Sequence, residues 1–395
     1  MPLLLAQPLQ RLMGFQPTFS FGTPAFILSR LQPLSPLFGA NTSSKSKEGR
    51  QHKIMRLAGK TAIITGAGSG INLSFARALL TKHCNVLFAD LALRPEAQEL
   101  VSNHANQSQS PAKAVFQKTD VRDWQQLERM FHVASKEFGG ADIVCPGAGV
   151  YEPPFSNFWH PPGKPPSEDD PTSNRYAILD INLTHPIRTT QLAISHLLLL
   201  LLPLPSSSSS SSSSNKEKSS PKSIVHISSI AGQVTPLPGP IYNATKHGIN
   251  GFVRSLAPLD SRLGIRVTGV APGVIKTPLW TEAPEKLKLI ADDDAWVTPE
   301  FVADVMVSLV ENQTVRVSAG LGATGSRLSS GDAREGTKEV AVEGGMILEV
   351  AKGRVRVVEQ FNDVGPSGEG NTVGNMRVAE EEILERLAGG GWGVD

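Results

Sequence analysis

The chain has 395 residues, of which 40% are hydrophobic and 19% charged, so it can bury a sizeable core and is not disordered throughout. Its 38 basic and 37 acidic residues leave a net charge of +1, which gives no overall field that would favour nucleic acid or an anionic membrane. The two cysteines, Cys84 and Cys145, allow at most one disulfide and no metal cluster, and they favour a reducing, intracellular compartment.

Residues 1–54 precede the first predicted strand and have no acidic residue before Glu48. Arg11 and Arg30, in a segment rich in Leu, Pro and Ser, are typical of a transit peptide. The other interpretation is an over-extended gene model, with Met55 as the true start. In both cases we expect a disordered leader outside the fold, in a protein that is cytoplasmic, or mitochondrial if the leader is a transit peptide.

From Leu57 onwards, short apolar strands alternate with amphipathic helices. The predicted strands cover 61–68, 85–90, 114–120, 141–149, 223–229, 266–272 and 345–358. The predicted helices cover 71–83, 94–105, 123–139, 175–201 and 299–312, with a further helix that holds Tyr242. This alternation predicts parallel β-α-β units, and strands that are apolar throughout are typical of a sheet covered on both faces. The sequence therefore predicts an α/β fold with one Rossmann-like, doubly wound parallel sheet and helices on both faces, in a single domain.

Low-complexity segments interrupt the alternation without changing its order. A serine-rich stretch over 205–222 is expected to be a solvated loop, and a Gly- and Ser-rich insertion covers 318–345. The predicted organisation is the leader, one domain over 55–361 with these two insertions, and a Gly-rich tail over 362–395. The apolar run that begins at Leu197 ends in prolines after far fewer than the roughly 20 residues that a bilayer span needs, so we predict no transmembrane segment.

A glycine-rich turn over Thr65–Asn72 joins the first predicted strand to the first helix. Glycines there let the backbone approach a pyrophosphate, whose charge is stabilised by the helix N-terminus. Asp90 ends the next strand, and its separation in sequence from the glycine-rich turn is that at which an acidic residue binds a ribose 2′-hydroxyl. Because a carboxylate would repel a 2′-phosphate, the sequence favours NAD, with NADP as the open alternative.

A second group of residues follows the strand over 223–229. Tyr242 and Lys246 are one helical turn apart, so both side chains lie on the same face of the helix. A free phenol has a pKa of about 10, and a nearby ammonium lowers that pKa towards the range where proton transfer is efficient. Ser229 closes the preceding strand, where its hydroxyl could hold a substrate oxygen against Tyr242.

Both groups of residues resemble motifs of the short-chain dehydrogenase/reductase family. Thr65, Gly66 and Gly70 match its TGxxxGxG loop, and Ser229 followed by Tyr-x-x-x-Lys matches its active site. The resemblance implies that Tyr242 is the catalytic acid/base. It also implies that Lys246 lowers the tyrosine pKa and binds the nicotinamide ribose.

Further roles follow from the same resemblance. Asn182 matches an asparagine that supports a proton-relay water, the alternative being a helix amide that faces solvent. Asp120 matches a residue that contacts the adenine, although it could merely cap the next helix. Val274 and Thr277 match a loop that meets the nicotinamide carboxamide, unless they form an ordinary turn. The cofactor-binding residues implied in this way are Gly66, Ser69, Gly70, Ile71, Asp90, Asp120, Val121, Gly147, Tyr242, Lys246, Val274 and Thr277.

The chain departs from the family pattern in two places. Asn72 stands where the family usually has a third glycine, and its side chain could push the first helix off the strand. Pro146 and Gly147 replace two asparagines of the Asn-Asn-Ala-Gly segment, which steady the central sheet in the family. The seating of the cofactor depends on how these departures are accommodated.

The predicted function is an NAD(P)-dependent oxidoreductase that interconverts a secondary alcohol and a ketone on a bulky hydrophobic substrate. The overall look is similar to fungal members that act on steroid-like, terpenoid or polyketide alcohols in secondary metabolism. The alternatives are a cofactor-binding sensor or scaffold without turnover, and a dehydrogenase disabled by its insertions. The resemblance further implies a homodimer or homotetramer, while the balanced net charge predicts no nucleic-acid partner.

Overall fold

The computed structural model describes residues 56–105, 110–201, 222–287, 290–291, 294–318 and 336–360, together with residues 381, 384, 385 and 389. The predicted leader and most of the serine-rich stretch and of the tail lie outside the described residues. Among the described residues, none of the helices is both long and apolar enough to span a bilayer.

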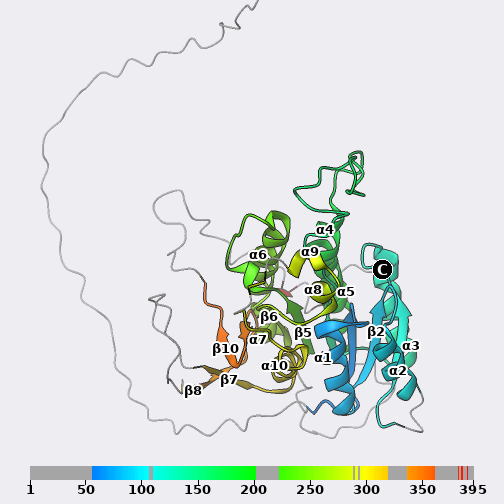
Figure 1. The fold of residues 1–395 in the computed structure, drawn as a ribbon. Helices are drawn as coiled ribbons and strands as arrows, with labels where there is room; N and C mark the ends of the chain where they lie inside the picture. The colour runs from blue at the N-terminus through cyan, green and yellow to red at the C-terminus, as the bar shows by residue number, and fades with distance from the viewer. Residues whose placement is uncertain are drawn as a thin grey trace, which may run out of the picture. The chain divides into compact units, whose positions relative to one another are not determined.

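Parallel strands and helices alternate through the first two thirds of the described chain (Figure 1). The elements up to the middle of the sheet are β1 (Thr61–Thr65), α1 (Gly70–Thr81), β2 (Asn85–Asp90), α2 (Pro95–Asn103), β3 (Ala114–Lys118), α3 (Trp124–Phe138), β4 (Ile143–Cys145), α4 (Ala177–Leu179), the π-helical turn η1 (Asp180–Thr184) and α5 (His185–Leu201). They are followed by β5 (Lys222–Ile227), the 3₁₀ turn η2 (Ile230–Gly232), α6 (Pro240–Ser255), α7 (Pro258–Leu263), β6 (Ile265–Pro272), α8 (Pro278–Thr281), α9 (Pro284–Leu287), α10 (Pro299–Glu311), β7 (Thr314–Ser318), β8 (Thr337–Ala341), β9 (Ile347–Ala351) and β10 (Arg354–Val357).

Eight of these strands form one sheet, in the order β10-β9-β6-β5-β4-β1-β2-β3. All neighbours in it are parallel except β9 and β10, which pair as an antiparallel hairpin at the edge. The winding direction reverses between β1 and β4, and the crevice beyond the carboxyl ends of such strands is where α/β sheets bind ligands. The predicted doubly wound fold is confirmed, and it places the carboxyl ends of β1 and β4 at this crevice.

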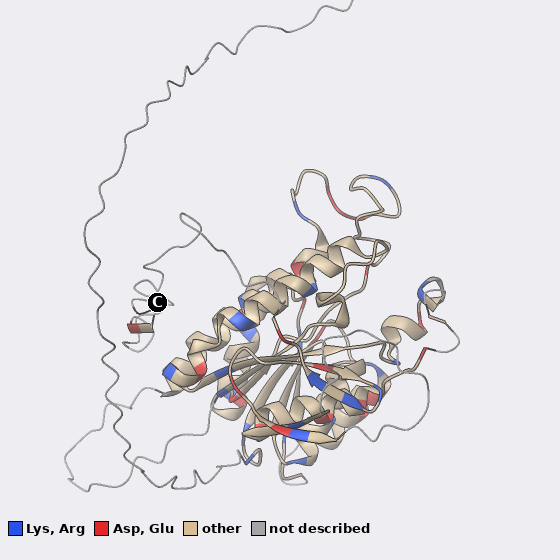
Figure 2. Cartoon of the chain, turned by 90° about the vertical axis from the view of Figure 1, so that its left-hand side faces the viewer, with Lys and Arg blue, Asp and Glu red and all other residues tan. Residues whose placement is uncertain are grey.

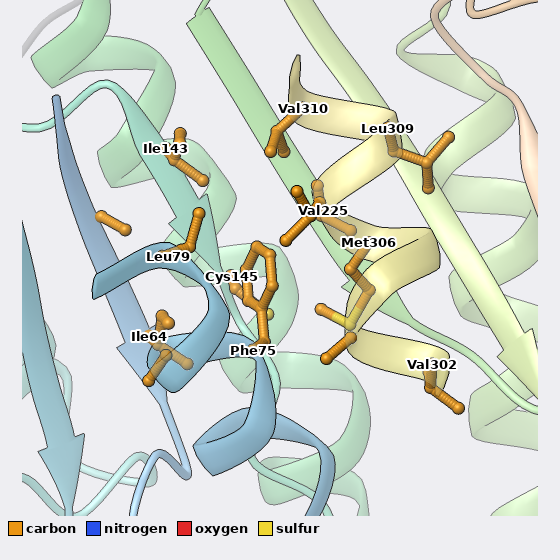
Figure 3. Close-up of a cluster of buried hydrophobic side chains, with 14 of the residues drawn as sticks. Ile64, Phe75, Leu79, Ile143, Cys145, Val225, Val302, Met306, Leu309 and Val310 are labelled. Carbon is orange, nitrogen blue, oxygen red and sulfur yellow. The ribbon is translucent and has the colours of Figure 1, made fainter. Parts of the chain in front are cut away.

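Helices cover both faces of the sheet, and successive residues of each strand point to opposite faces, so every strand contributes side chains to both sides. Ile63 and Val144 face one cluster, formed with α3, α5 and α6, while Ile64 and Cys145 face the other, formed with α1 and α10. Figure 3 shows the second cluster, in which Phe75 of α1 lies beside Met306 of α10, with the strands behind the two helices. Charged residues lie mostly away from this core, with basic and acidic positions interspersed along the ribbon (Figure 2).

Several details differ from the sequence prediction, which did not include β7 or the short helices α7, α8 and α9. The single last strand predicted over 345–358 is a hairpin, because Lys352 and Gly353 form a turn between β9 and β10. Residues 337–341, within the predicted insertion over 318–345, form β8, which pairs with β7 in a separate two-stranded sheet. The long helix predicted over 175–201 contains the π-helical turn η1.

Candidate active site

A cavity of about 830 Å³ opens at the carboxyl ends of the central strands, around the point where the winding reverses. With the exception of Asn182, every site residue predicted from the sequence lines it: Gly66, Ser69, Gly70, Ile71, Asp90, Asp120, Val121, Gly147, Ser229, Tyr242, Lys246, Val274 and Thr277. The glycine-rich turn and the Ser-Tyr-Lys group, which are far apart in the sequence, therefore share one cavity.

The glycine-rich turn leaves the N-terminus of α1 without a side-chain partner. Gly66 and Gly70 adopt φ values of +70° and +57°, which side chains rarely tolerate. Ser69, the residue before the helix, makes no capping hydrogen bond, and the first turn of α1 has no acidic residue. The first N–H groups of α1 are thus free of side-chain caps, as an anion-binding helix start requires.

Asp90 lies directly against this turn. Its Oδ2 accepts a hydrogen bond from the Gly68 N–H at 2.8 Å, and its Oδ1 accepts from the Leu91 N–H at 2.7 Å. A Cβ added to Gly68 would lie 2.5 Å from the Ala92 carbonyl oxygen, so the turn and the end of β2 pack without room for a side chain. A negative charge is therefore fixed beside the turn.

Asp120 pairs with Arg122 rather than capping a helix. The Arg122 Nη2 donates to Asp120 Oδ2 at 2.8 Å, and this hydrogen bond lowers the pKa of Asp120. The next helix, α3, is capped by Asp123, whose Oδ1 accepts the N–H of Gln125 at 2.9 Å. The alternative assignment of Asp120 as the helix cap is wrong.

The loop after β6 closes against the glycine-rich turn. A Cβ added to Gly70 would lie 3.2 Å from Thr277 Cγ2, while the Val274 carbonyl accepts the Val297 N–H at 2.9 Å. The turn that was matched to the pyrophosphate and the loop that was matched to the nicotinamide carboxamide therefore meet over one cavity.

Ser229, Tyr242 and Lys246 converge at the end of β5. Ser229 precedes η2, where its Oγ accepts the Ala231 N–H at 3.1 Å, and its side chain lies close enough to the Tyr242 phenol to lower the pKa of that phenol. The Lys246 Nζ lies 5.3 Å from the centroid of the Tyr242 ring and donates to the Ile227 carbonyl at 2.8 Å. The serine, the phenol and the ammonium thus face one another at the carboxyl edge of the sheet.

Burial dominates the acid–base properties of this group. It raises the pKa of Tyr242 to about 12, against the lowering effect of the Ser229 hydrogen bond. It also lowers the pKa of Lys246 to about 8, because the ammonium is removed from solvent. The expected downward shift of the tyrosine pKa is therefore not seen in the protein alone, because the loss of solvent outweighs the lowering effect of Ser229 and Lys246 is not among the causes.

Asn182 lies behind the cavity, in η1. Its Nδ2 donates to the Val150 carbonyl at 2.7 Å and its Oδ1 accepts the Val150 N–H at 2.9 Å. The side chain is 1% exposed, so the alternative of a solvent-facing amide is wrong. A Cβ added to Gly149 would lie 3.4 Å from Asn182 Oδ1 and 4.0 Å from Lys246 Nζ, which places both groups around the loop that follows β4.

The two departures from the family pattern fit each other. A Cβ added to Gly147 would lie 2.2 Å from Asn72 Oδ1, so the amide of Asn72 occupies the space that a side chain at 147 would need. Asn72 is buried in α1, and its Oδ1 accepts a weak hydrogen bond from the Cys145 thiol at 3.9 Å. The helix stays packed on the strand, because the extra side chain at 72 is matched by the missing one at 147.

His185 supplies a further link that sequence reasoning missed. Its Nδ1 donates to the Ile181 carbonyl at 3.0 Å, which leaves Nε2 to accept from Thr65 Oγ1 at 3.0 Å. The Ala148 N–H donates to the same Thr65 oxygen at 3.2 Å. This buried chain joins the end of β1, the loop after β4 and η1. A histidine four residues after the residue whose carbonyl it binds carries no signal that would reveal this link in the sequence.

An aromatic wall beside the Tyr242 phenol was also missed in part. The Tyr151 ring meets the Tyr242 ring edge-on at 4.8 Å between centroids and stacks on Trp280 at 5.2 Å. Both Tyr151 and Trp280 line the cavity, together with Phe155. None of the sequence motifs described above distinguishes Tyr151 or Trp280.

Comparison with known proteins gives one consistent result. A family model described as short chain dehydrogenase matches residues 60–288. The chain is 27% identical over 275 residues to 15-hydroxyprostaglandin dehydrogenase [NAD(+)] of Rattus norvegicus, a match that covers 66% of this chain and 90% of that protein. It is 28% identical over 223 residues to D-beta-hydroxybutyrate dehydrogenase of Cupriavidus necator, covering 56% of this chain and 73% of that one.

A crystal structure of a short-chain type dehydrogenase/reductase from Mycobacterium marinum shares the fold, with a TM-score of 0.50 and 23% identity over 65% of this chain and 89% of that one. The prediction of an oxidoreductase enzyme is confirmed by the family match. The chain belongs to the short-chain dehydrogenase family.

Proposed function

We propose that the protein is an NAD-dependent dehydrogenase that interconverts a secondary alcohol and a ketone on a bulky, uncharged, hydrophobic substrate. The observation that carries the proposal is the convergence of Ser229, Tyr242 and Lys246 on the cavity that also holds the glycine-rich turn. The relatives named above are dehydrogenases, and the best-covered of them carries NAD(+) in its name.

The cavity fits a dinucleotide. The uncapped start of α1 offers N–H groups to a pyrophosphate, and the close approach of Gly66 to Ala148, where a Cβ would lie 2.8 Å from Ala148 Cα, keeps side chains out of the turn. Asp90 would accept from the adenosine ribose and would repel a 2′-phosphate, which favours NAD over NADP. When bound, the nicotinamide supplies or accepts the hydride.

The residues of the chain would handle the proton and the substrate oxygen. In the oxidation direction, Tyr242 takes the hydroxyl proton while Ser229 holds the oxygen by its own hydroxyl. Lys246 places a positive charge beside the phenol and favours its ionised form. That Asn182 supports a proton-relay water stays a prediction, because both polar atoms of its side-chain amide are hydrogen-bonded to the main chain of Val150.

The wall of the cavity supports an uncharged, hydrophobic substrate. Tyr151 and Trp280 form its aromatic side next to the phenol. In the described part of the cavity, both arginines are already paired: Arg94 Nη1 donates to Glu282 at 2.6 Å, and Arg122 binds Asp120. A short hydroxy acid would find neither guanidinium available for its carboxylate. A steroid-like, terpenoid or polyketide alcohol, as in fungal secondary metabolism, is our proposal for the substrate class, and a homodimer or homotetramer for the assembly.

The test is a screen of bulky secondary alcohols with NAD, followed by Tyr242→Phe with the best substrate. Removing the phenolic hydroxyl, and with it the proton acceptor, should lower kcat by about 10²–10⁴-fold and leave NADH binding intact. A variant that keeps wild-type kcat would remove the proposed mechanism. The sensor alternative predicts NADH binding without turnover, but the mutual fit of Asn72 and Gly147 takes away the observation that favoured it.

A further inference from the structure

The helix that carries Tyr242 begins without a cap of its own. The residue before α6 is Gly239, which makes no side-chain hydrogen bond, and the helix then starts with Pro240. Tyr242 is the third residue of α6, so its N–H has no acceptor within the helix. An uncapped first turn would fray, and the phenol of Tyr242 would move with it.

A carboxylate from a distant loop takes the place of the cap. Glu152, in the loop after β4, accepts the Tyr242 N–H on its Oε1 at 2.8 Å. The carboxylate lies at the positive end of the helix dipole, where negative charge is stabilised. Burial raises the pKa of Glu152, and the hydrogen bond from Tyr242 opposes that shift. The acid is therefore held half-buried at a helix start, in a position usually taken by a neighbouring Ser, Thr or Asp.

The loop backbone is arranged to deliver this side chain. Glu152 has a φ of +32°, a left-handed conformation that residues other than glycine seldom adopt. Such strain persists where surrounding contacts over-determine it, and it gathers at functional sites. The two residues before Glu152 are fixed as well, because Asn182 holds both main-chain groups of Val150 and the Tyr151 ring packs on the Tyr242 ring.

We propose that Glu152 is a positioning residue of the active site, which caps α6 from the loop after β4 and thereby holds the Tyr242 phenol in place. The inference rests on the proposed role of Tyr242 as acid/base. Glu152 itself does not act on the substrate: it acts through the main chain of Tyr242. Lys246 lies a full turn further along α6, so the loss of the cap should disturb the phenol much more than the ammonium.

The experiment compares Glu152→Ala, Glu152→Gln and the control Asp123→Ala in the NAD-dependent oxidation of the best alcohol from the screen. Asp123 caps α3 by the same kind of bond, accepting the Gln125 N–H at 2.9 Å, and it lies outside the catalytic machinery. We expect Glu152→Ala to lower kcat roughly tenfold or more, as a small misplacement of a reacting group does, with the KM for NAD unchanged. Glu152→Gln keeps an acceptor oxygen and should restore most of kcat.

A second readout does not depend on turnover. Hydrogen exchange of the NADH complexes should show faster exchange at the start of α6 in Glu152→Ala, with no such change in Asp123→Ala. Wild-type kcat or unchanged exchange in Glu152→Ala would overturn the proposal, as would an equal loss of kcat in Asp123→Ala. A Glu152→Gln variant as slow as Glu152→Ala would overturn the capping role. If the wild type oxidises no alcohol, the proposed function fails, and the exchange data still decide whether Glu152 caps the helix.

Discussion

Asn72 and Gly147 should respond to mutation as one unit. The perturbation is a set of three variants: Gly147→Asn, which restores the residue of the family pattern, Asn72→Gly, which does the same at 72, and the two combined. In the wild type, a Cβ at 147 would lie 2.2 Å from Asn72 Oδ1 and 2.7 Å from its Cγ, and Asn72 is only 7% exposed. Asn72 therefore has little room to move aside.

The magnitudes follow from packing. Gly147→Asn alone overfills a closed space and should lower the free energy of unfolding by about 1–3 kcal/mol. Asn72→Gly alone places a glycine in α1, at a cost of about 1 kcal/mol. In the double variant the clash disappears, so its loss should stay near that of Asn72→Gly. We expect a favourable coupling of about 1–3 kcal/mol between the two sites.

Urea unfolding of the four proteins measures this coupling, and NADH titration shows whether the glycine-rich turn is restored with it. Gly251→Asn serves as the control, because a Cβ at Gly251 meets nothing within 4 Å. The reasoning is refuted if the two single losses add to within about 0.5 kcal/mol in the double variant, since independent sites behave in that way.

Three further predictions concern charge. Asp90→Asn keeps an acceptor for the Gly68 N–H but removes the charge, so NADH preference over NADPH should fall roughly tenfold in fluorescence titrations, because a like charge nearby costs about 1–4 kcal/mol; an unchanged preference contradicts this. Burial lowers the pKa of His185 from 6.5 to about 4, so its contribution to stability is complete above about pH 6.5 and is lost as the pH falls towards 4. The free energy of unfolding should then drop by about 2 kcal/mol more between pH 7 and pH 5 in the wild type than in His185→Gln, and equal slopes in urea unfolding would count against it. Glu282→Gln should free Arg94, which joins α2 to the end of α8, and so speed NADH release in stopped-flow measurements without changing stability, because the pair is exposed; an unchanged release rate would show that the pair does not restrain the cofactor.

The parts of the fold that could be predicted are those with a local pattern. The strand over Asn85–Asp90 was predicted with its observed bounds, because six adjacent residues contain the whole pattern, an apolar run with a polar residue at each end. The hairpin of β9 and β10 could not be predicted from the sequence, because the residues on both sides of Lys352 and Gly353 favour strands equally and look like one continuous strand. A π-helical turn over Asp180–Thr184 leaves the helical periodicity almost unchanged, so it has no signature in composition.

The site, like the fold, has parts that the sequence predicts and parts that it does not. The lining residues could be predicted because their spacing places them at strand ends and helix starts. The fit of Asn72 against Gly147, and the cap that Glu152 gives to Tyr242, depend on contacts between segments far apart in the chain. The direction of the Tyr242 pKa shift depends on how much solvent is lost, and spacing does not report that.

The position of the serine-rich stretch has a practical consequence. It connects Leu201, the end of α5, to Lys222, the start of β5, whereas the cavity is reached at the other end of β5 near Ser229. A strand of six residues separates the two, roughly 20 Å at the usual rise per residue. The connection between Leu201 and Lys222 thus starts and ends at the rim of the sheet opposite the reacting groups. A fluorescent reporter or a purification handle inserted in this connection should therefore leave turnover unchanged.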